Sequence, residues 1–273
     1  MVKNDLFGFL KTNPRGAKPR KEGITEIRGP YYTVMGRFYL KDVLETMGQY
    51  IDSLKFAGGS FTLLPKDVLH DIIETAHANN VLVSTGGFIE YVMTQGKEAV
   101  EKYIAACKQA GFDIIELSCG FITLTTNDWL HLIKMVQRAG LKAKPEIGIQ
   151  FGAGGATPEK DLKAEGIRDM AQVVYQAKCF FKAGVDMIMI ESEGITENTN
   201  PWRTDIIAQF MNELDPQKLM FEAADPPVFE WYIKNYGHNI NLFVDHSQIV
   251  QLECLRSGIW GTKSTWGRIQ GLK

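Results

Sequence analysis

The sequence predicts an α/β protein that folds as one (β/α)8 TIM barrel. Eight short runs rich in Val, Ile, Met and Phe follow one another along the chain, as buried parallel strands do. Segments of helical period separate them, and most runs begin about thirty residues after the previous one, the length of one βα unit. The 273 residues also match the roughly 250 of a single barrel domain. A doubly wound open sheet is the alternative, but regular units without a nucleotide-binding glycine fingerprint favour a closed barrel.

The expected strands begin near residues 24, 53, 81, 113, 143, 187, 219 and 241, and nearly every run ends in a charged or polar residue. In chain order, the runs are GITEIR (Gly23–Arg28), SLKFAGGS (Ser53–Ser60), VLVSTGG (Val81–Gly87), FDIIELSCG (Phe112–Gly120), KAKPEIG (Lys142–Gly148), MIMIESEG (Met187–Gly194), KLMFEAAD (Lys218–Asp225) and NLFVDHS (Asn241–Ser247). In a (β/α)8 barrel the catalytic groups lie at the C-terminal ends of the strands. These polar strand ends are therefore the predicted active site.

The helices expected between the strands combine apolar periodicity with helix-ending residues. In the first of them, apolar residues that include Ile72 and Ala76 form one stripe along the helix. Gly111 and Gly140 each follow a predicted helix, as a residue that readily adopts the left-handed conformation common at helix ends. The predicted helices are Lys66–Asn79, Lys97–Ala110, Thr126–Ala139, Met170–Ala183, Asn200–Leu214, Pro226–Tyr236 and Ser247–Ser257.

The composition is that of an ordinary globular protein, with 45% hydrophobic residues and a net charge of −2. This charge argues against nucleic-acid binding, and the apolar runs are too short to span a membrane. Four widely spaced cysteines without a CxxC pair are expected to be reduced thiols, so we expect a cytoplasmic protein. Residues 1–22 form a basic arm ahead of a single barrel domain, residues 23–273, and this arm has no apolar segment typical of a secretory signal.

Acidic side chains are concentrated at the predicted strand ends. Glu116, Glu146 and Glu191 end three consecutive strands, and Glu222 ends a later one. Carboxylates at one end of a barrel repel one another unless a cation lies among them, and Mg²⁺ prefers such oxygen ligands. The four glutamates are the predicted metal ligands, although each could instead pair with a lysine or arginine. Lys55 ends the second strand and is expected to bind an anionic substrate or, if burial lowers its pKa, to transfer a proton.

Two other segments at these strand ends suggest anion binding. The long loop after the fifth strand, residues 149–166, is a mobile lid, a backbone cradle for an anion at Gly154 and Gly155, or a simple surface loop. Ser247, at the start of the last helix, could bind a phosphate, although the neighbouring Asp245 would repel one.

An ordered series of motifs resembles the phosphosulfolactate synthase family. The resemblance runs from about Lys18 to Gly261, and most of its motifs lie at a strand end. The motifs are KPRKEGIT (Lys18–Thr25), YIDSLKFAGGS (Tyr50–Ser60), TGGFIEY (Thr85–Tyr91), IELSCG (Ile115–Gly120), PEIG (Pro145–Gly148), MIMIESEG (Met187–Gly194), MFEA (Met220–Ala223) and NLFVDHSQIVQLECLRSGIWG (Asn241–Gly261).

This resemblance implies a Mg²⁺-dependent (β/α)8 lyase that adds sulfite to phosphoenolpyruvate, a small anionic substrate, and it suggests a homo-oligomer. The residues that it supports as lining the active site are Lys55, Glu90, Glu116, Glu146, Glu191, Glu222 and Asp245. Of these, Lys55 and Glu146 are the expected catalytic residues, and Arg256, which matches the last helix, is expected to bind substrate. After the fifth-strand Glu-x-Gly, the family enzymes carry a lysine pair with a proposed catalytic lysine, where this chain has Ile149 and Gln150. Glutamine cannot take over the charge or the proton transfer of a lysine.

Lys144, two residues before Glu146 on the same face of the fifth strand, is then the nearest basic candidate for proton transfer. A second departure follows the first strand, where the family enzymes carry an Asp-Lys-Gly turn and this chain reads Arg28-Gly29-Pro30. The resemblance extends to plant heat-stress-associated proteins, to which this sequence looks closer. The alternative function is thus a non-catalytic, stress-related protein that binds another protein. The replaced lysine favours this alternative, and the retained carboxylates weigh against it.

Overall fold

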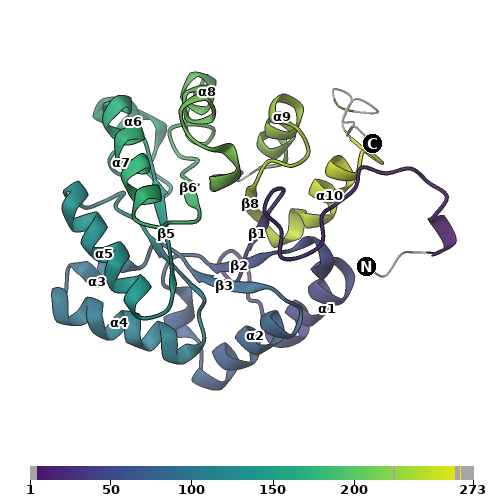
Figure 1. Cartoon of the computed structure of the whole chain (residues 1–273), viewed down its shortest axis with the longest axis horizontal. Helices are drawn as coiled ribbons and strands as arrows, with labels where there is room; N and C mark the ends of the chain where they lie inside the picture. The colour runs from purple at the N-terminus through teal and green to yellow at the C-terminus, as the bar shows by residue number, and fades with distance from the viewer. Residues whose placement is uncertain (1–4, 224, 262–264, 266–273) are drawn as a thin grey trace.

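The computed structural model describes residues 5–223, 225–261 and 265, and it confirms the predicted barrel. Eight parallel strands close in chain order, with β8 hydrogen-bonded back to β1 (Figure 1). The strands are β1 (Thr25–Arg28), β2 (Ser53–Phe56), β3 (Leu82–Thr85), β4 (Ile114–Leu117), β5 (Lys142–Ile147), β6 (Ile188–Ile190), β7 (Leu219–Glu222) and β8 (Leu242–Asp245). Residues 1–4 of the expected arm and residues 224, 262–264 and 266–273 of the expected domain lie outside the described residues.

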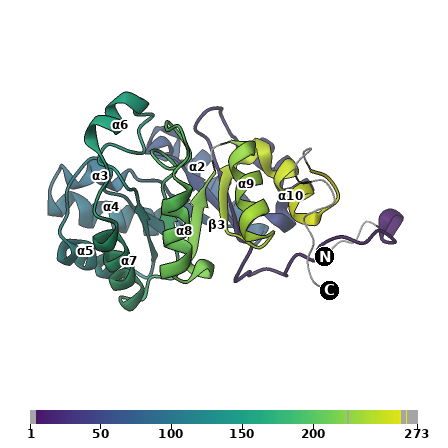
Figure 2. The same ribbon diagram turned by 90° about the horizontal axis from the view of Figure 1, so that it is seen from above.

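Helices surround the strands (Figures 1 and 2). They are α1 (Arg37–Met47), α2 (Lys66–Ala78), α3 (Ile89–Met93), α4 (Lys97–Ala110), α5 (Thr126–Arg138), α6 (Glu159–Glu165), α7 (Met170–Lys182), α8 (Thr204–Glu213), α9 (Pro226–Tyr236) and α10 (Ile249–Ser257). The ends of these helices use local devices: Thr125 Oγ1 accepts a hydrogen bond from Asp128 N at the start of α5, and Gly111 ends α4 with φ at 99°.

Each predicted helix is present, with its start or end shifted by a few residues at most. The helix expected from Ser247 begins at Ile249, because the Asp245 side chain accepts a hydrogen bond from Ser247 N and holds a 3-10 turn first. Helices α1, α3 and α6 were not predicted. Helices α3 and α6 have too few residues to show a period. Helix α1 does carry an apolar stripe, with Leu40 and Leu44 buried and Val43 and Met47 packed against the core, and the prediction overlooked it.

The main hydrophobic core lies outside the barrel, between the strands and the helices. Inside the barrel, a small apolar cluster of Met189, Met220 and Phe243 fills the side lined by β6–β8. The opposite side of the interior is charged, because inward positions of β1, β2, β4 and β5 carry acidic and basic residues. The register places Arg28 beside Lys55 and Glu116 beside Lys144.

The N-terminal arm follows the outside of the barrel and passes beside α10 (Figure 2). Arg15 Nε donates a hydrogen bond to Glu253 Oε2 of α10 at 3.0 Å, and Arg20 Nη1 donates one to Asp52 Oδ1 at 2.8 Å. Within the described part of the chain, no helix combines the length and the apolar character needed to cross a bilayer.

Candidate functional site

A cavity of about 620 Å³ opens at the C-terminal ends of the strands, which we call the mouth of the barrel. Seven glutamates and two cations line it: Glu90, Glu116, Glu146, Glu191, Glu193, Glu197, Glu222, Arg28 and Lys55. The prediction that carboxylates at the strand ends converge is thus confirmed. Aromatic side chains, including Tyr32 and Phe243, form much of the remaining wall.

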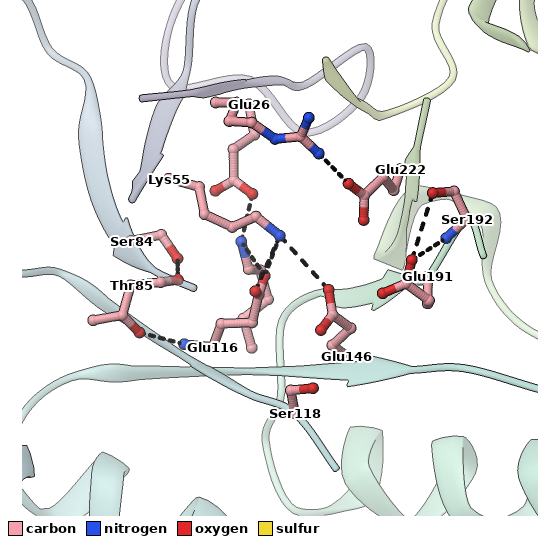
Figure 3. Close-up of polar contacts among 12 residues, drawn as sticks. Glu26, Lys55, Ser84, Thr85, Glu116, Ser118, Glu146, Glu191, Ser192 and Glu222 are labelled. Carbon is pink, nitrogen blue, oxygen red and sulfur yellow. Dashed lines mark hydrogen bonds and ion pairs between the residues drawn. The ribbon is translucent and has the colours of Figure 1, made fainter. Parts of the chain in front are cut away.

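Lys55 lies at the floor of the mouth between two carboxylates (Figure 3). Its Nζ donates hydrogen bonds to both oxygens of Glu116 at 3.0 Å and lies 3.6 Å from Glu146 Oε1. The ammonium also lies 4.0 Å from the centroid of the Phe243 ring. Burial lowers the pKa of Lys55, but Glu116, Glu146 and the other nearby carboxylates raise it more, so the net shift is upward. Lys55 is consequently a fixed cation, which rules out the lowered pKa considered for proton transfer.

Three of the four glutamates expected to bind a metal come together at the mouth. Glu146, Glu191 and Glu222 each offer a carboxylate oxygen, and these oxygens lie within 4.8 Å of one another. Burial is the main cause that raises the pKa of all three, and nearby carboxylates add to it: Glu222 acts on Glu146 and Glu191, while Glu197 and Glu116 act on Glu222. Repulsion of this kind is relieved when a cation binds among the oxygens.

Glu116, the fourth expected ligand, lies deeper and binds lysines. Besides its two bonds to Lys55, its Oε2 lies 3.2 Å from Lys144 Nζ. Burial and the nearby Glu146 raise the pKa of Glu116 to about 7, against the opposing effect of the two lysines. Glu116 therefore titrates near neutral pH while lining the mouth.

Arg28 is a residue of the mouth that the sequence did not identify as functional. Its Nη2 donates a hydrogen bond to Glu222 Oε1 at 2.5 Å, and its guanidinium lies over the rings of Tyr32 and Phe243. Burial lowers the pKa of Arg28, but Glu222 and other acidic groups raise it by more, so its pKa lies above the usual value. The available signal was its position, since Arg28 is the last residue of β1.

Backbone N–H groups of the loop after β5 bind a carboxyl group of the protein itself, that of Glu193. The backbone N–H groups of Gly154 and Gly155 donate to Glu193 Oε2 at 2.7 and 3.3 Å, and Thr157 N donates to the same carboxylate. Gly154 also lies so close to Glu191 that a Cβ would come within 2.8 Å of its Oε2. The expected substrate cradle at Gly154 and Gly155 is corrected on this point, because both donors are already used by Glu193.

Three other expected site residues lie away from the mouth cavity. Lys144 lies deeper in the barrel than Glu116, and Glu116 separates it from the mouth. Its Nζ donates a hydrogen bond to Glu26 Oε2 at 2.5 Å. Ser247 lies outside the lining, and both its N–H and its hydroxyl donate to Asp245 Oδ1.

Arg256 is the third of these residues, and it does not line the mouth. It is fully buried in α10, donates from Nη1 to the His238 carbonyl oxygen at 2.6 Å, and lies beside Glu253, which binds Arg15 of the arm. It cannot reach a substrate in the mouth from this position. The sequence places Arg256 on the last helix but does not show whether its side chain faces the mouth.

Ile149 and Gln150, the two residues expected to depart from the resembled family, have structural roles. Ile149 is fully buried in the main hydrophobic core. Gln150 Nε2 donates to the Leu162 carbonyl oxygen of α6 at 2.6 Å, and this residue is outside the mouth lining. The cations that line the mouth among the described residues are therefore Lys55 and Arg28.

Solved structures share the barrel architecture. The carboxyl transferase domain from Rhizobium etli pyruvate carboxylase matches with a TM-score of 0.55 and 14% identity over 83% of this chain and 40% of that one. The 3-hexulose-6-phosphate synthase from Salmonella typhimurium matches with a TM-score of 0.53 and 10% identity over 84% of this chain and 97% of that one. At such low identity these matches support the fold alone.

Comparison of sequences gives a narrower result. Residues 13–262 match the family model described as (2R)-phospho-3-sulfolactate synthase (ComA). Protein HEAT-STRESS-ASSOCIATED 32 of Arabidopsis thaliana is 38% identical over 91% of this chain and 90% of its own length. Phosphosulfolactate synthase of Methanothermobacter thermautotrophicus is 25% identical over 97% of this chain and 99% of its own length. With a family model that spans nearly the whole barrel, the chain belongs to the (2R)-phospho-3-sulfolactate synthase family.

Proposed function

We propose that this protein is a lyase that adds a small nucleophile, sulfite, to phosphoenolpyruvate with the aid of Mg²⁺ bound at the mouth. The observation that carries the proposal is the group of three carboxylate oxygens within 4.8 Å, placed in one cavity with Lys55 and Arg28. Family membership supports the reaction class, and relatives named phosphosulfolactate synthase support the substrates.

The donor set suits a hard divalent cation. Glu146, Glu191 and Glu222 would hold it, since they offer oxygen atoms alone and are mutually repelled without it. Bound there, Mg²⁺ would supply positive charge opposite the negative charge that the substrate gains during the addition. The backbone of the two following residues holds the Glu191 carboxylate in place, because Ser192 N and Glu193 N donate hydrogen bonds to its Oε1 at 2.8 and 3.0 Å.

Two side chains are available to bind an anionic substrate. Lys55 and Arg28 keep their charge, because neighbouring carboxylates raise the pKa of each. A substrate carboxylate or phosphate at the mouth would take over part of their present contacts with Glu146 and Glu222. The planar guanidinium of Arg28 favours a two-point contact with such a group.

The addition also needs a proton. Sulfite forms a bond to the methylene carbon, the electron pair of the double bond moves toward the carboxylate, and the neighbouring carbon then accepts a proton. We assign this proton to Glu116, which lines the mouth and whose pKa of about 7 lets it carry a proton at neutral pH. Lys144 contacts the other side of Glu116 and would act as a positioning residue for it.

The test is incubation of the purified protein with phosphoenolpyruvate, sulfite and Mg²⁺, followed by phosphorus NMR. We expect a new phosphorylated product whose formation stops with EDTA and in Glu146→Gln, while Lys134→Gln on the outside of α5 leaves it unchanged. No sulfonated product from the folded wild-type protein would refute the substrate assignment. A lack of Mg²⁺ binding in calorimetry would refute the metal site.

A second candidate is a non-catalytic protein of heat-stress responses. The 38% identity to HEAT-STRESS-ASSOCIATED 32 and the structural use of Ile149 and Gln150 favour it. The double variant Glu146→Gln/Glu191→Gln distinguishes the two functions. If the folded double variant restores heat tolerance to cells that lack the protein, the mouth is not the working site. If heat tolerance is lost with the mouth carboxylates, the enzymatic function is favoured.

A further inference from the structure

A second cavity, of about 850 Å³, opens at the opposite end of the barrel. It is lined by residues at the N-terminal ends of strands, among them Ser53 of β2, Leu82 of β3 and Lys142 of β5. It shares no lining residue with the mouth. The ion pairs of Lys144 with Glu26 and with Glu116 lie between the two cavities, so each is a separate compartment.

The inner wall of this cavity is largely apolar. Ile24, Leu82, Ile114, Met187 and Met220 line it, and the small side chain of Ser53 leaves space inside the barrel. The Ser53 hydroxyl donates to Glu26 Oε1 at 2.9 Å, and Lys144 occupies Glu26 Oε2, so the polar groups deepest in the cavity already have partners. Such a wall gives an ordered water few partners and favours an apolar group.

The rim of the cavity is basic. Its cations are Lys18, Arg20, Lys21, Lys142 and Lys218, and its acids are Asp52, Asp186 and Asp215.

Some of these cations already have partners within the protein. Arg20 pairs with Asp52 and Lys142 with Asp186, while Lys18 donates to the backbone carbonyl oxygens of Asn79 and Asn80.

Lys21 and Lys218 differ from them. Neither ammonium has a carboxylate within 4.0 Å among the residues that the structure describes, and both residues are exposed. The ammonium of Lys218 instead lies 5.4 Å from the centroid of the Phe181 ring. Asp215, the remaining acid, accepts a hydrogen bond from Gln217 N. The rim therefore presents two cations without carboxylate partners at the opening of an apolar chamber.

We propose that this cavity binds a small amphipathic organic anion, with its apolar part inside the barrel and its anionic head at Lys21 and Lys218. The volume lies within the range of roughly 300–1,000 Å³ typical of small-molecule sites. An apolar wall with a few charged groups at its edge is the usual composition of such sites. Carboxylate and phosphate heads share the chemistry that the rim recognises. The proposal does not depend on the activity proposed for the mouth.

Calorimetric titration of the full chain in EDTA tests the proposal with three probes of one ring system: 1-naphthyl phosphate, 1-naphthoate and uncharged 1-naphthol. EDTA removes Mg²⁺ from the mouth, and the variants below show in which cavity the anion binds. We expect one-to-one binding of at least one anion, at least about tenfold tighter than 1-naphthol and weakened by added salt. The tighter of the two anions identifies the preferred head group.

Variants locate the bound anion. Lys21→Glu/Lys218→Glu reverses the rim charges and is expected to weaken binding about tenfold or more. Leu82 lines the cavity and is 39% exposed, so this position leaves room for a larger ring. The indole of Leu82→Trp should fill the cavity, and this variant is expected to abolish binding. The matched charge reversal Lys102→Glu/Lys134→Glu on the outer helices α4 and α5 should change the affinity less than twofold. The proposal is overturned if neither anion binds, if 1-naphthol binds as tightly, or if the rim and chamber variants bind like wild type.

Discussion

Replacement of Lys55 by methionine removes the ammonium from the floor of the mouth while nearly preserving its volume. In the folded protein this group contacts Glu116 at 3.0 Å and Glu146 at 3.6 Å, and its side chain is only 5% exposed. Removing one partner of a buried ion pair leaves an uncompensated charge and costs about 3–5 kcal/mol. We expect Lys55→Met to lower the free energy of unfolding by this amount at pH 8.5.

The loss should shrink as the pH falls, because the carboxyl group left behind can take up a proton. In wild type the pKa of Glu116 is about 7, so above pH 7 this group is ionised in both the folded and the unfolded chain. Without Lys55 its pKa rises further, and the folded variant then holds a proton that the unfolded chain has lost. The stability of the variant therefore falls with rising pH by about 1.4 kcal/mol per unit. Between pH 8.5 and 7 the difference from wild type should shrink by roughly 2 kcal/mol.

Urea denaturation in EDTA, followed by circular dichroism at both pH values, measures these free energies of unfolding. Lys102→Met is the matched control, because Lys102 pairs with Glu98 at 2.7 Å but is 75% exposed. It should cost less than about 0.5 kcal/mol at either pH. A loss below about 1 kcal/mol for Lys55→Met, or a loss of equal size at pH 7 and pH 8.5, would show that the ammonium does not compensate the charge of the buried carboxylates.

Three further outcomes can be checked. Mg²⁺ at a hundredfold its Kd should stabilise wild type by about 2.7 kcal/mol in thermal denaturation, and Glu191→Gln should lose most of this gain; equal gains would exclude the site. Gly194→Ala should destabilise the fold by about 1–3 kcal/mol in urea, because φ at Gly194 is 77° and the added Cβ would come within 1.9 Å of Gln150 Oε1, whereas Gly16→Ala, with open space around its Cβ, should be neutral. Burial raises the pKa of the Cys107 thiol to about 12, so peptide mapping should show alkylation by iodoacetamide at pH 8 roughly a thousandfold slower than after unfolding; fast labelling of the native protein would contradict this pKa.

Much of the fold follows from patterns that neighbouring residues create. The strand β6, which ends at Ile190 just before Glu191, is marked by a buried apolar run. The helix α4, which ends before Gly111, is marked by an apolar stripe and a glycine at its end. The short helices α3 (Ile89–Met93) and α6 (Glu159–Glu165) were missed for the same reason, since a helix of one or two turns has too few positions to show a period.

The candidate site was predictable in its composition but not in its pairings. Strand ends must meet at one end of a closed barrel, so the convergence of Glu146, Glu191 and Glu222 follows from the positions of three runs. Their nearness to one another, with Glu116 instead bound to Lys55, depends on barrel register and depth. Sequence spacing carries neither quantity.

The sequence by itself determined the barrel, its family and an acidic mouth with Lys55 as a cation, because these depend on periodicity and on the order of residues along the chain. Only the tertiary structure decided that Glu193 occupies the glycine amides of the long loop, that Arg28 enters the mouth, and that Arg256 faces away from it. These outcomes join segments far apart in the chain, and the burial that raises the pKa of Glu116 to about 7 is likewise a property of the closed barrel. Contacts of this kind exist only once the eight strands have closed.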